Sequence, residues 1–407
     1  MKRTTILLLI ITLILAACGE DEAPDLTATT GSVAVPTEAA AAVVPTDTPA
    51  AAATATLAPP PTLAAPPTLT PVLPDPTATT APIEAINLVT LADFGTDRNP
   101  LTGLIVDDPA NLQRRPLAIK ISNSPPSYVR PQSGLMDADM VWEHITEGLI
   151  TRFTMIVYGS TPPNVGPIRS ARLIDLELPA MFDAALVYSG ASVGVSRKLT
   201  SSDFASRIYY SWYPGYYRTG ENKPYEHTLY GRPEEFWAGL EERDLNTPPN
   251  FATNMQFSSL PPEGGEPATG VTIDYQWEMM EWQYDPETNR YFRWSGGEPH
   301  FDANYNVQVN VANVIIVFAN HAEDANICEE ARDGVCRALS VQPQIWDQGP
   351  LMILRDGQVY EGGWRRANRG DMLTFYDHAG HPIPLQLGNS WVQVVPTFFN
   401  NPVNVTN

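Results

Sequence analysis

The 407-residue chain is acidic, with 46 Asp and Glu residues against 25 Lys and Arg residues and a formal net charge of −21. This balance argues against nucleic acid as a partner and against electrostatic adhesion to anionic lipid, because both need a basic surface. The chain also lacks a phosphate-binding loop, a dinucleotide fingerprint and a paired CxxC motif. We therefore expect no nucleic-acid partner, no cofactor and no metal site.

The first eighteen residues have the pattern of a secretion signal. Lys2 and Arg3 precede an apolar run over 6–15, and Ala16 and Ala17 lead directly to Cys18. The run is about half as long as the roughly 20 residues that a transmembrane helix needs. Small residues followed by a cysteine resemble the lipobox of bacterial lipoproteins, in which the thiol is acylated. We predict that a lipid on Cys18 holds the protein at the outer face of the cell membrane. The alternative is an ordinary secretory signal followed by a chance cysteine.

Residues 19–85 form a segment of biased composition. They contain 13 prolines and 14 threonines but no aromatic residue, no Lys and no Arg. Such a segment cannot bury enough apolar surface to offset the entropy lost on ordering it. We predict a disordered stalk that lifts the rest of the chain off the membrane.

The remaining residues, 86–407, are numerous enough for two domains of ordinary size. In the first part, over 86–250, apolar runs alternate with turn and helix signals, which predicts a mixed α/β arrangement. Strands are expected over 116–122, 140–145, 150–158 and 184–189, and helices near 195–199 and over 233–243. The second helix is expected because Pro233 is followed by Glu234 and Glu235 in its first turn.

The second part, over 251–407, has almost no helical periodicity. Alternating or β-branched runs predict strands over 271–277, 290–294, 307–318, 351–354, 372–376 and 390–395. Turn signals such as Asp356-Gly357 separate the runs, so the strands are expected to pair as antiparallel hairpins. The boundary between the two parts falls in the segment 246–270, which is rich in Pro and Gly.

The two cysteines beyond Cys18 lie close together. Cys328 and Cys336 flank a polar segment, and outside the cytoplasm two cysteines at this spacing most often form a disulfide. A zinc site is the weaker alternative, because it would need four ligands and only His321 lies nearby. We predict a disulfide between Cys328 and Cys336.

Several motifs together resemble those of one protein family. They are Asn99-Pro-Leu-Thr-Gly103, Arg115-Pro116, Arg130-Pro-Gln-Ser-Gly-Leu135, Glu147-Gly148, Thr151-Arg-Phe153, Gly166-Pro-Ile-Arg-Ser-Ala-Arg172 and Gly388-Asn-Ser-Trp391. With the hairpin-rich second part, they resemble the YerB-like family of bacterial lipoproteins over nearly all of 95–400. The resemblance implies an α+β fold, a layered sandwich with mixed and antiparallel sheets. It implies no activity, because none is established for that family.

The sequence departs from the family pattern at two places. A segment of Pro-His-Asn-Leu-Tyr type is replaced by the run Tyr225 to Tyr230, which lacks the Pro and the Asn. The cysteine pair Cys328 and Cys336 is also not among the features that carry the resemblance.

One motif resembles the nucleophile of a serine hydrolase. Gly190-Ala-Ser-Val-Gly194 matches G-x-S-x-G between an apolar run and an expected helix. A catalytic triad would consist of Ser192, Asp203 and His227. An α/β-hydrolase, however, needs a parallel sheet that continues through the chain, and the second part here consists of hairpins. The alternative is a tight turn between a strand and a helix.

A second group of candidate residues is charged. Glu143 and Glu147 are four residues apart in an extended stretch, which predicts that they share one face, and Arg152, Arg169 and Arg172 follow. We expect the five side chains to converge. The arginines suit a carboxylate or phosphate ligand, and the alternative is a structural network in which glutamates and arginines neutralise each other.

The third group is aromatic. Six rings crowd the segment 209–217: Tyr209, Tyr210, Trp212, Tyr213, Tyr216 and Tyr217. Core packing accounts for most of them, but Pro214 and Gly215 indicate a loop in which Trp212 and Tyr213 could stack on a glycan.

The sequence thus favours a non-catalytic role, although it leaves the question of enzymatic activity open. We predict a lipid-anchored extracytoplasmic protein of the cell envelope that binds a ligand, a cell-wall glycan or an envelope protein. The alternatives are a serine-dependent hydrolase using Ser192 and a solute-binding lipoprotein of a transporter. The transporter alternative would need repeated parallel βα units in both lobes.

Overall fold

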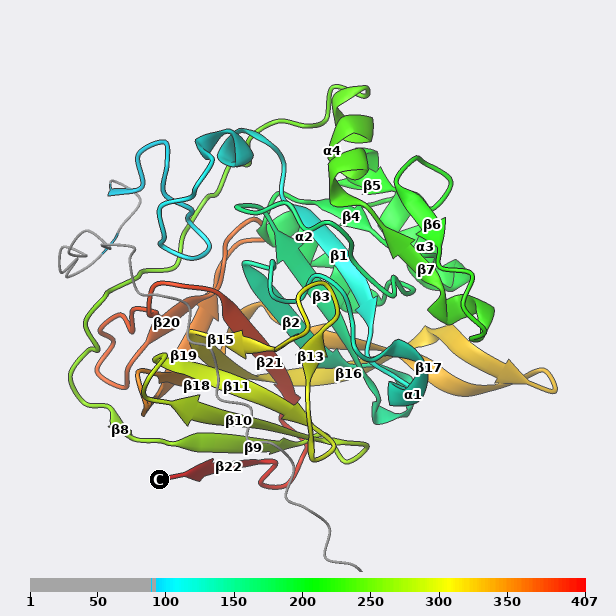
Figure 1. Ribbon diagram of the computed structural model, residues 1–407. Coiled ribbons are helices and arrows are strands. Elements are labelled where there is room, and N and C mark those ends of the chain that lie inside the picture. The colour runs from blue at the N-terminus through cyan, green and yellow to red at the C-terminus, as the bar shows by residue number, and fades with distance from the viewer. Residues whose placement is uncertain (1–88, 90–92) are drawn as a thin grey trace, which may run out of the picture. The chain divides into compact units, whose positions relative to one another are not determined.

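Two large β-sheets organise the part of the chain that the computed structural model describes, residue 89 and residues 93–407 (Figure 1). The predicted signal peptide, Cys18 and the predicted stalk over 19–85 lie outside these residues. Within the described part, no helix is both long enough and apolar enough to cross a membrane.

The larger sheet has twelve strands drawn from both parts of the sequence. Its main path runs β20-β19-β18-β16-β21-β2-β3-β1-β4-β5, with β17 paired to β16 and β8 paired to β19. The first part contributes β1 (Leu117–Ser122), β2 (Met140–Ile145), β3 (Thr151–Val157), β4 (Ala185–Val187) and β5 (Ile208–Tyr209). The second part contributes β8 (Glu266–Pro267), β16 (Asn313–Arg332), β17 (Val335–Gln344), β18 (Asp347–Arg355), β19 (Gln358–Arg366), β20 (Thr374–Tyr376) and β21 (Ser390–Pro396).

The second sheet has six strands, in the order β12-β11-β10-β9-β22 with β15 paired to β11. These strands are β9 (Gly270–Asp274), β10 (Met279–Asp285), β11 (Arg290–Ser295), β12 (Glu298–Pro299), β15 (Asn310–Val311) and β22 (Val403–Thr406). Two small hairpins complete the strands: β6 (Tyr216–Arg218) with β7 (Leu229–Gly231), and β13 (Phe301–Asp302) with β14 (Val307–Gln308).

The helices are short and belong to the first part of the sequence. The α-helices are α1 (Pro126–Val129), α2 (Leu178–Met181), α3 (Val193–Thr200) and α4 (Pro233–Glu241). The 3₁₀ turns are η2 (Pro109–Gln113), η3 (Glu147–Leu149), η4 (Leu173–Leu176), η5 (Ala205–Arg207) and η6 (Tyr225–His227). This confirms the predicted α+β class with a β-rich second part.

The two parts of the sequence meet at β2 and β21, which pair in parallel with Val141 opposite Trp391. Both strands are buried on both faces along their whole length, which explains their nearly continuous apolar sequence. Alternate side chains of β2 enter different cores. Met140 and Trp142 pack against the helical side, whereas Val141 and Ile145 pack with side chains of the six-stranded sheet. The result is a layered sandwich with one long sheet in the middle.

Strand β16 is much longer than the sequence predicts. The expected strand ends at residue 318, but β16 continues to Arg332 and pairs with β17 from Asn320 onward. Beyond the sheet, the two strands form a projecting hairpin arm, which is orange in Figure 1. Most side chains of β16 after His321 are at least partly exposed, so the apolar alternation that marks a half-buried strand is absent there.

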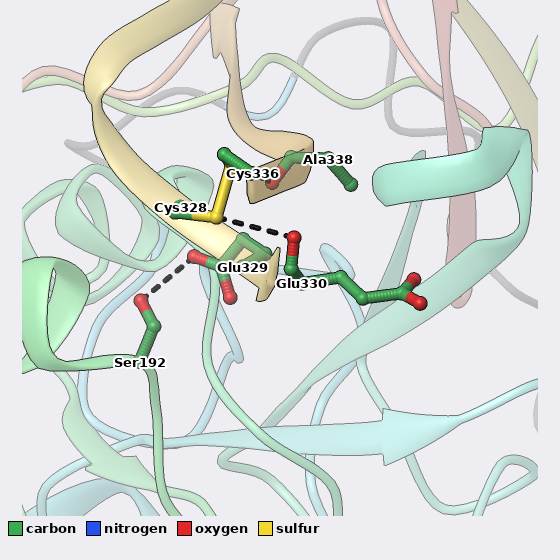
Figure 2. The surroundings of a disulfide bond; sticks show 6 residues. All are labelled: Ser192, Cys328, Glu329, Glu330, Cys336 and Ala338. Carbon is green, nitrogen blue, oxygen red and sulfur yellow. Dashed lines mark hydrogen bonds between the residues drawn. A yellow bond between two sulfur atoms is a disulfide. The ribbon is translucent and has the colours of Figure 1, made fainter. Parts of the chain in front are cut away.

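The tip of this arm contains the predicted disulfide, Cys328–Cys336, with a Cα–Cα distance of 5.7 Å (Figure 2). The arm lies against α3. Lys198 pairs with Asp324 at 2.8 Å, and a Cβ atom placed on Gly194 would come within 2.7 Å of the Ile327 side chain. The disulfide therefore closes a hairpin whose base is in the large sheet and whose tip contacts a helix.

We predict that replacing both Cys328 and Cys336 with Ser loosens the arm more than it destabilises the protein. The chain-entropy term for so short a loop is about 2–3 kcal/mol, and we expect the loss to appear as faster hydrogen exchange in β16 and β17 near the tip, measured by mass spectrometry. Cys→Ser at Cys328 alone serves as the unpaired control. Free thiols at both positions in denatured, unreduced protein would show that the disulfide does not form.

Candidate functional site

Glu143 and Glu147 do not share a face, so that prediction is wrong. Strand β2 ends at Ile145, and η3 then turns the chain, with Gly148 in a left-handed conformation at φ 72°. Glu143 is on the face that packs against the six-stranded sheet, where Arg293 donates to its Oε2 at 2.8 Å. Glu147 contacts Arg172 instead. The five predicted charges therefore separate into Glu143 alone and a group of four.

Glu143 is fully buried, and both of its carboxylate oxygens have partners. Oε1 accepts from the Thr151 hydroxyl at 2.8 Å, and Oε2 accepts from the Trp391 indole at 3.0 Å as well as from Arg293. The Arg293 guanidinium lies 4.7 Å from the centre of the Trp391 ring. This carboxylate holds β2, β3, β11 and β21 together and has no free oxygen for a ligand.

The network continues from Arg293 to His300 and Gln132, all three buried. His300 accepts from Arg293 at Nδ1 and contacts Gln132 Oε1 through Nε2 at 2.6 Å, which assigns the proton to Nε2. Burial, followed by the positive charge of Arg293, holds the pKa of His300 well below its usual range. His300 is thus a neutral link between the two parts of the sequence.

A second buried network lies on the opposite face of the large sheet. The ammonium of Lys120 contacts Asp175 at 2.9 Å, His144 Nε2 at 2.6 Å and the Thr154 hydroxyl at 3.0 Å. Burial lowers the pKa of Lys120 to about 8, against the attraction of the Asp175 carboxylate, which raises it. Because both charges of this pair are fully inaccessible to solvent, we assign it a structural role.

Four of the predicted charges do converge beside this network. Arg152, Arg169, Arg172 and Glu147 lie close enough that the positive charges of Arg172 and Arg169, after burial, help to lower the pKa of Arg152 to about 9. We call these four residues the arginine site. Among the three arginines, Arg172 alone forms a short ion pair with a residue that the structure describes, from Nε to Glu147 Oε2 at 2.6 Å, and Glu329 lies 3.7 Å from its Nη1.

The other two arginines bond to backbone carbonyls. Arg152 is 7% exposed and donates to the Ser170 carbonyl at 2.8 Å, and Arg169 donates to the Glu226 carbonyl at 3.4 Å. Among the residues that the structure describes, no carboxylate lies within ion-pair distance of either guanidinium. Burying a cation without an anion is costly, so Arg152, which is buried, is the unusual feature of the site, whereas Arg169 is only partly buried.

Two buried polar atoms, one in the arginine site and one beside it, have no hydrogen-bond partner within the described part of the chain. They are Glu147 Oε1 and His227 Nδ1. The His227 ring stacks on Tyr128 of α1 at a centroid distance of 5.5 Å. Burial, followed by the charges of Arg169 and Arg152, lowers the pKa of His227. An acceptor oxygen and an imidazole nitrogen thus lie unbonded and shielded from solvent beside the guanidinium groups.

The proposed triad of Ser192, Asp203 and His227 is not assembled. The Ser192 hydroxyl donates to Glu329 at 2.8 Å (Figure 2) and accepts from the Val195 amide, which makes Ser192 the N-cap of α3. The carboxylate of Asp203 bonds to Arg369. Over residues 93–407, no hydrogen bond links any two members of the triad. The G-x-S-x-G motif here forms the start of a helix.

The aromatic segment divides into core and surface. Tyr209 is fully buried, and the Tyr216 hydroxyl donates to the Tyr209 carbonyl at 2.7 Å. Trp212 is 72% exposed and stacks flat on Tyr210 at 4.2 Å, while Tyr213 is half-buried and lies near the Arg243 guanidinium. Trp212 is therefore the ring of this segment that is most accessible to a glycan.

Lys120 and Arg293 are not identified from the sequence as members of buried charge networks, although the sequence contains a signal for each. Lys120 interrupts the apolar run of β1, and Arg293 lies among aromatic residues in β11. A charge inside a run that is otherwise typical of a buried strand indicates a buried pair. The partner cannot be found in the same way, because it comes from a distant segment.

Two consecutive family models, for which no function is described, match this chain. Residues 101–246 match the family described as "Protein of unknown function (DUF3048) N-terminal domain", and residues 271–392 match the corresponding C-terminal domain. The chain therefore belongs to the YerB-like family that these two domains define, as its motifs predict.

Two comparisons from Bacillus subtilis support the assignment. The chain is 29% identical over 304 residues to the protein of strain 168 described as "Putative lipoprotein YerB", which covers 73% of this chain and 86% of that relative. A crystal structure of the YerB protein from Bacillus subtilis matches with a TM-score of 0.61 at 27% identity, covering 76% of this chain and 99% of that one.

We predict that Glu143→Gln destabilises the protein by about 3–5 kcal/mol, because it leaves the buried Arg293 cation without its anion. The free energy of unfolding can be measured by urea denaturation. Glu234→Gln, on the exposed side of α4, is the matched control and should change it by less than about 0.5 kcal/mol. A loss of under 1 kcal/mol for Glu143→Gln would contradict the structural role given to this pair.

Proposed function

We propose that this protein is a lipid-anchored extracytoplasmic binding protein whose arginine site takes a ligand with a carboxylate or phosphate group. The observation that carries the proposal is the pair of guanidinium groups, Arg152 and Arg169, without a carboxylate partner among the described residues. Planar guanidinium groups bind carboxylate and phosphate oxygens through two parallel hydrogen bonds. The anion of the ligand would then neutralise charge that the protein leaves uncompensated.

The unpartnered atoms narrow the chemistry of the ligand. Glu147 Oε1 can only accept a hydrogen bond when the carboxylate is ionised. Its natural partner is a hydroxyl or amino group next to the anionic group of the ligand. His227 Nδ1 can donate to the same anion. We therefore expect a small hydroxylated or aminated anion, or the end of a larger molecule that carries these groups.

The anchoring half of the proposal rests on the sequence of the first eighteen residues and on the relative described as a lipoprotein. An acyl chain on Cys18 would hold the arginine site outside the cytoplasm without a membrane-spanning helix. One chain alone gives only reversible attachment, so more than one acyl chain is expected.

We predict that Cys18→Ser abolishes lipidation and releases the protein from the membrane fraction. The serine hydroxyl cannot replace the thiol that accepts the lipid. Mass spectrometry of the N-terminal peptide of the wild-type protein should show acyl chains on Cys18. An unmodified mature N-terminus that begins at another residue would refute this half of the proposal.

Arg169→Ala and Arg172→Ala are predicted to have opposite effects on stability. Arg169→Ala removes one of three crowded positive charges, so the melting temperature should hold or rise. Arg172→Ala strands the Glu147 carboxylate and should cost about 2 kcal/mol. Large destabilisation by both variants would show that the site is a closed structural network.

Binding is tested with the same variants and two simple probes, inorganic phosphate and citrate. Each should raise the melting temperature of the wild-type protein above that in sodium chloride of equal ionic strength, because a ligand of the native state stabilises it. Arg169→Ala should lose this increase. Arg232→Ala, which removes an exposed arginine of the 232–235 pair, should keep it, and an equal loss in both variants would indicate nonspecific charge screening.

A further inference from the structure

A separate pocket lies between α1 and the β12–β13 segment. It has a volume of roughly 570 Å³, and both parts of the sequence line it: Pro126, Arg130 and Pro131 from the first, Glu298, Pro299 and Phe301 from the second. None of these belongs to the arginine site. The volume falls within the range of small-ligand pockets, and such pockets are frequent where two parts of a protein meet.

Hydrogen bonds hold two of the residues that line this pocket, Arg130 and His300, in place. Arg130 bonds to both oxygens of Glu278 and also donates to Asn123 Oδ1 at 2.9 Å from Nη2. His300, which also lines the pocket, is bonded to Gln132 and Arg293. A pocket supported from behind in this way keeps its shape before a ligand arrives.

The charges of the pocket disfavour an anionic ligand. Arg130 is neutralised by Glu278, which leaves the Glu298 carboxylate, and this carboxylate makes no hydrogen bond or ion pair to any other residue between 93 and 407. The balance is thus slightly negative, the reverse of the arginine site. An uncharged ligand with hydroxyl donors fits it best, because an ionised carboxylate can only accept hydrogen bonds.

The walls supply flat apolar surfaces. Phe301 is 38% exposed, and the rings of Pro126, Pro131 and Pro299 surround the same space. An apolar wall beside a free carboxylate and the Asn306 amide matches a molecule with one C–H face and an edge of hydroxyl groups. A sugar ring has this combination.

We propose that this pocket binds a sugar ring of an uncharged glycan, with the ring face on Phe301 and its hydroxyls bonded to Glu298 and Asn306. The site is distinct from the aromatic segment that the sequence singles out, and it does not depend on the arginine site. The pocket depends on the association of the two parts of the sequence, because residues from both parts line it.

The test is isothermal titration of the full chain, held in a detergent without a sugar headgroup, with a panel of neutral oligosaccharides. The panel contains N-acetylglucosamine tetramer, maltotetraose and mannotetraose, and we expect saturable binding of at least one. Phe301→Ala should then weaken the dissociation constant about tenfold through the lost ring contact. Glu298→Gln should weaken it about fivefold, because a charged acceptor forms stronger hydrogen bonds, and it leaves the exposed surface otherwise unchanged.

Trp212→Ala is the matched control, because it removes an exposed aromatic ring outside the pocket. It should leave the dissociation constant within about twofold. Loss of binding in Trp212→Ala but not in Phe301→Ala would overturn the proposal in favour of the aromatic segment. No saturable binding of any sugar on the panel would also overturn it, as would binding of a tetralysine peptide in place of sugars. None of these outcomes bears on the phosphate and citrate measurements.

Discussion

The buried ion pair of Glu143 and Arg293 is the interaction on which the rest of this structure depends. Its two residues are 150 positions apart and come from different sequence parts, so neither part can satisfy its own charge. Desolvating both ions is expensive, and Thr151 and Trp391 offset part of the cost by filling the remaining positions on the carboxylate. The two matched domains are therefore interdependent, and the shared strand pairing of β2 with β21 is the backbone counterpart of this ion pair.

The large sheet separates two kinds of buried charge. On the face toward the six-stranded sheet, the Glu143 carboxylate has no unused acceptor. On the other face, the Lys120–Asp175 pair is closed in the same way, but the neighbouring arginine site contains more cations than short ion pairs. Because both faces belong to the same strands, the arginines of the arginine site lie on a sheet whose buried carboxylates, Glu143 and Asp175, are fully paired. Whether each buried charge has a partner therefore distinguishes a candidate site from a structural network more clearly than the number of charged residues does.

Strands whose apolar residues alternate or form a continuous run could be predicted from the sequence. Strands β1, β2, β3 and β21 are examples. The side of the sheet on which Glu147 lies could not be predicted, because η3 interrupts the alternation of side chains immediately after β2. The sequence around Ser192 fits two local structures equally well, a nucleophile turn and a helix cap, and the structure distinguishes them through the bonds of Ser192 to the Val195 amide and to Glu329 on the distant arm. Long-range partners such as Arg293 leave no local trace beyond an unexpected charge in an apolar run. The sequence therefore predicts elements well and assigns their contacts poorly.

The four-residue helix α1 lies between the arginine site and the pocket for which a sugar ligand is proposed. Tyr128 covers His227 on one side of it, while Pro126 and Ser127 line the pocket on the other. A single turn of helix has little internal stability of its own, so its position follows whichever neighbour contacts it most tightly. If a ligand bound at one site shifts this turn, the ligand affinity of the other site changes, and thermodynamic linkage requires the effect to be equal in both directions. Binding of an anion would then change the affinity for a glycan, and the reverse, through the four residues of α1.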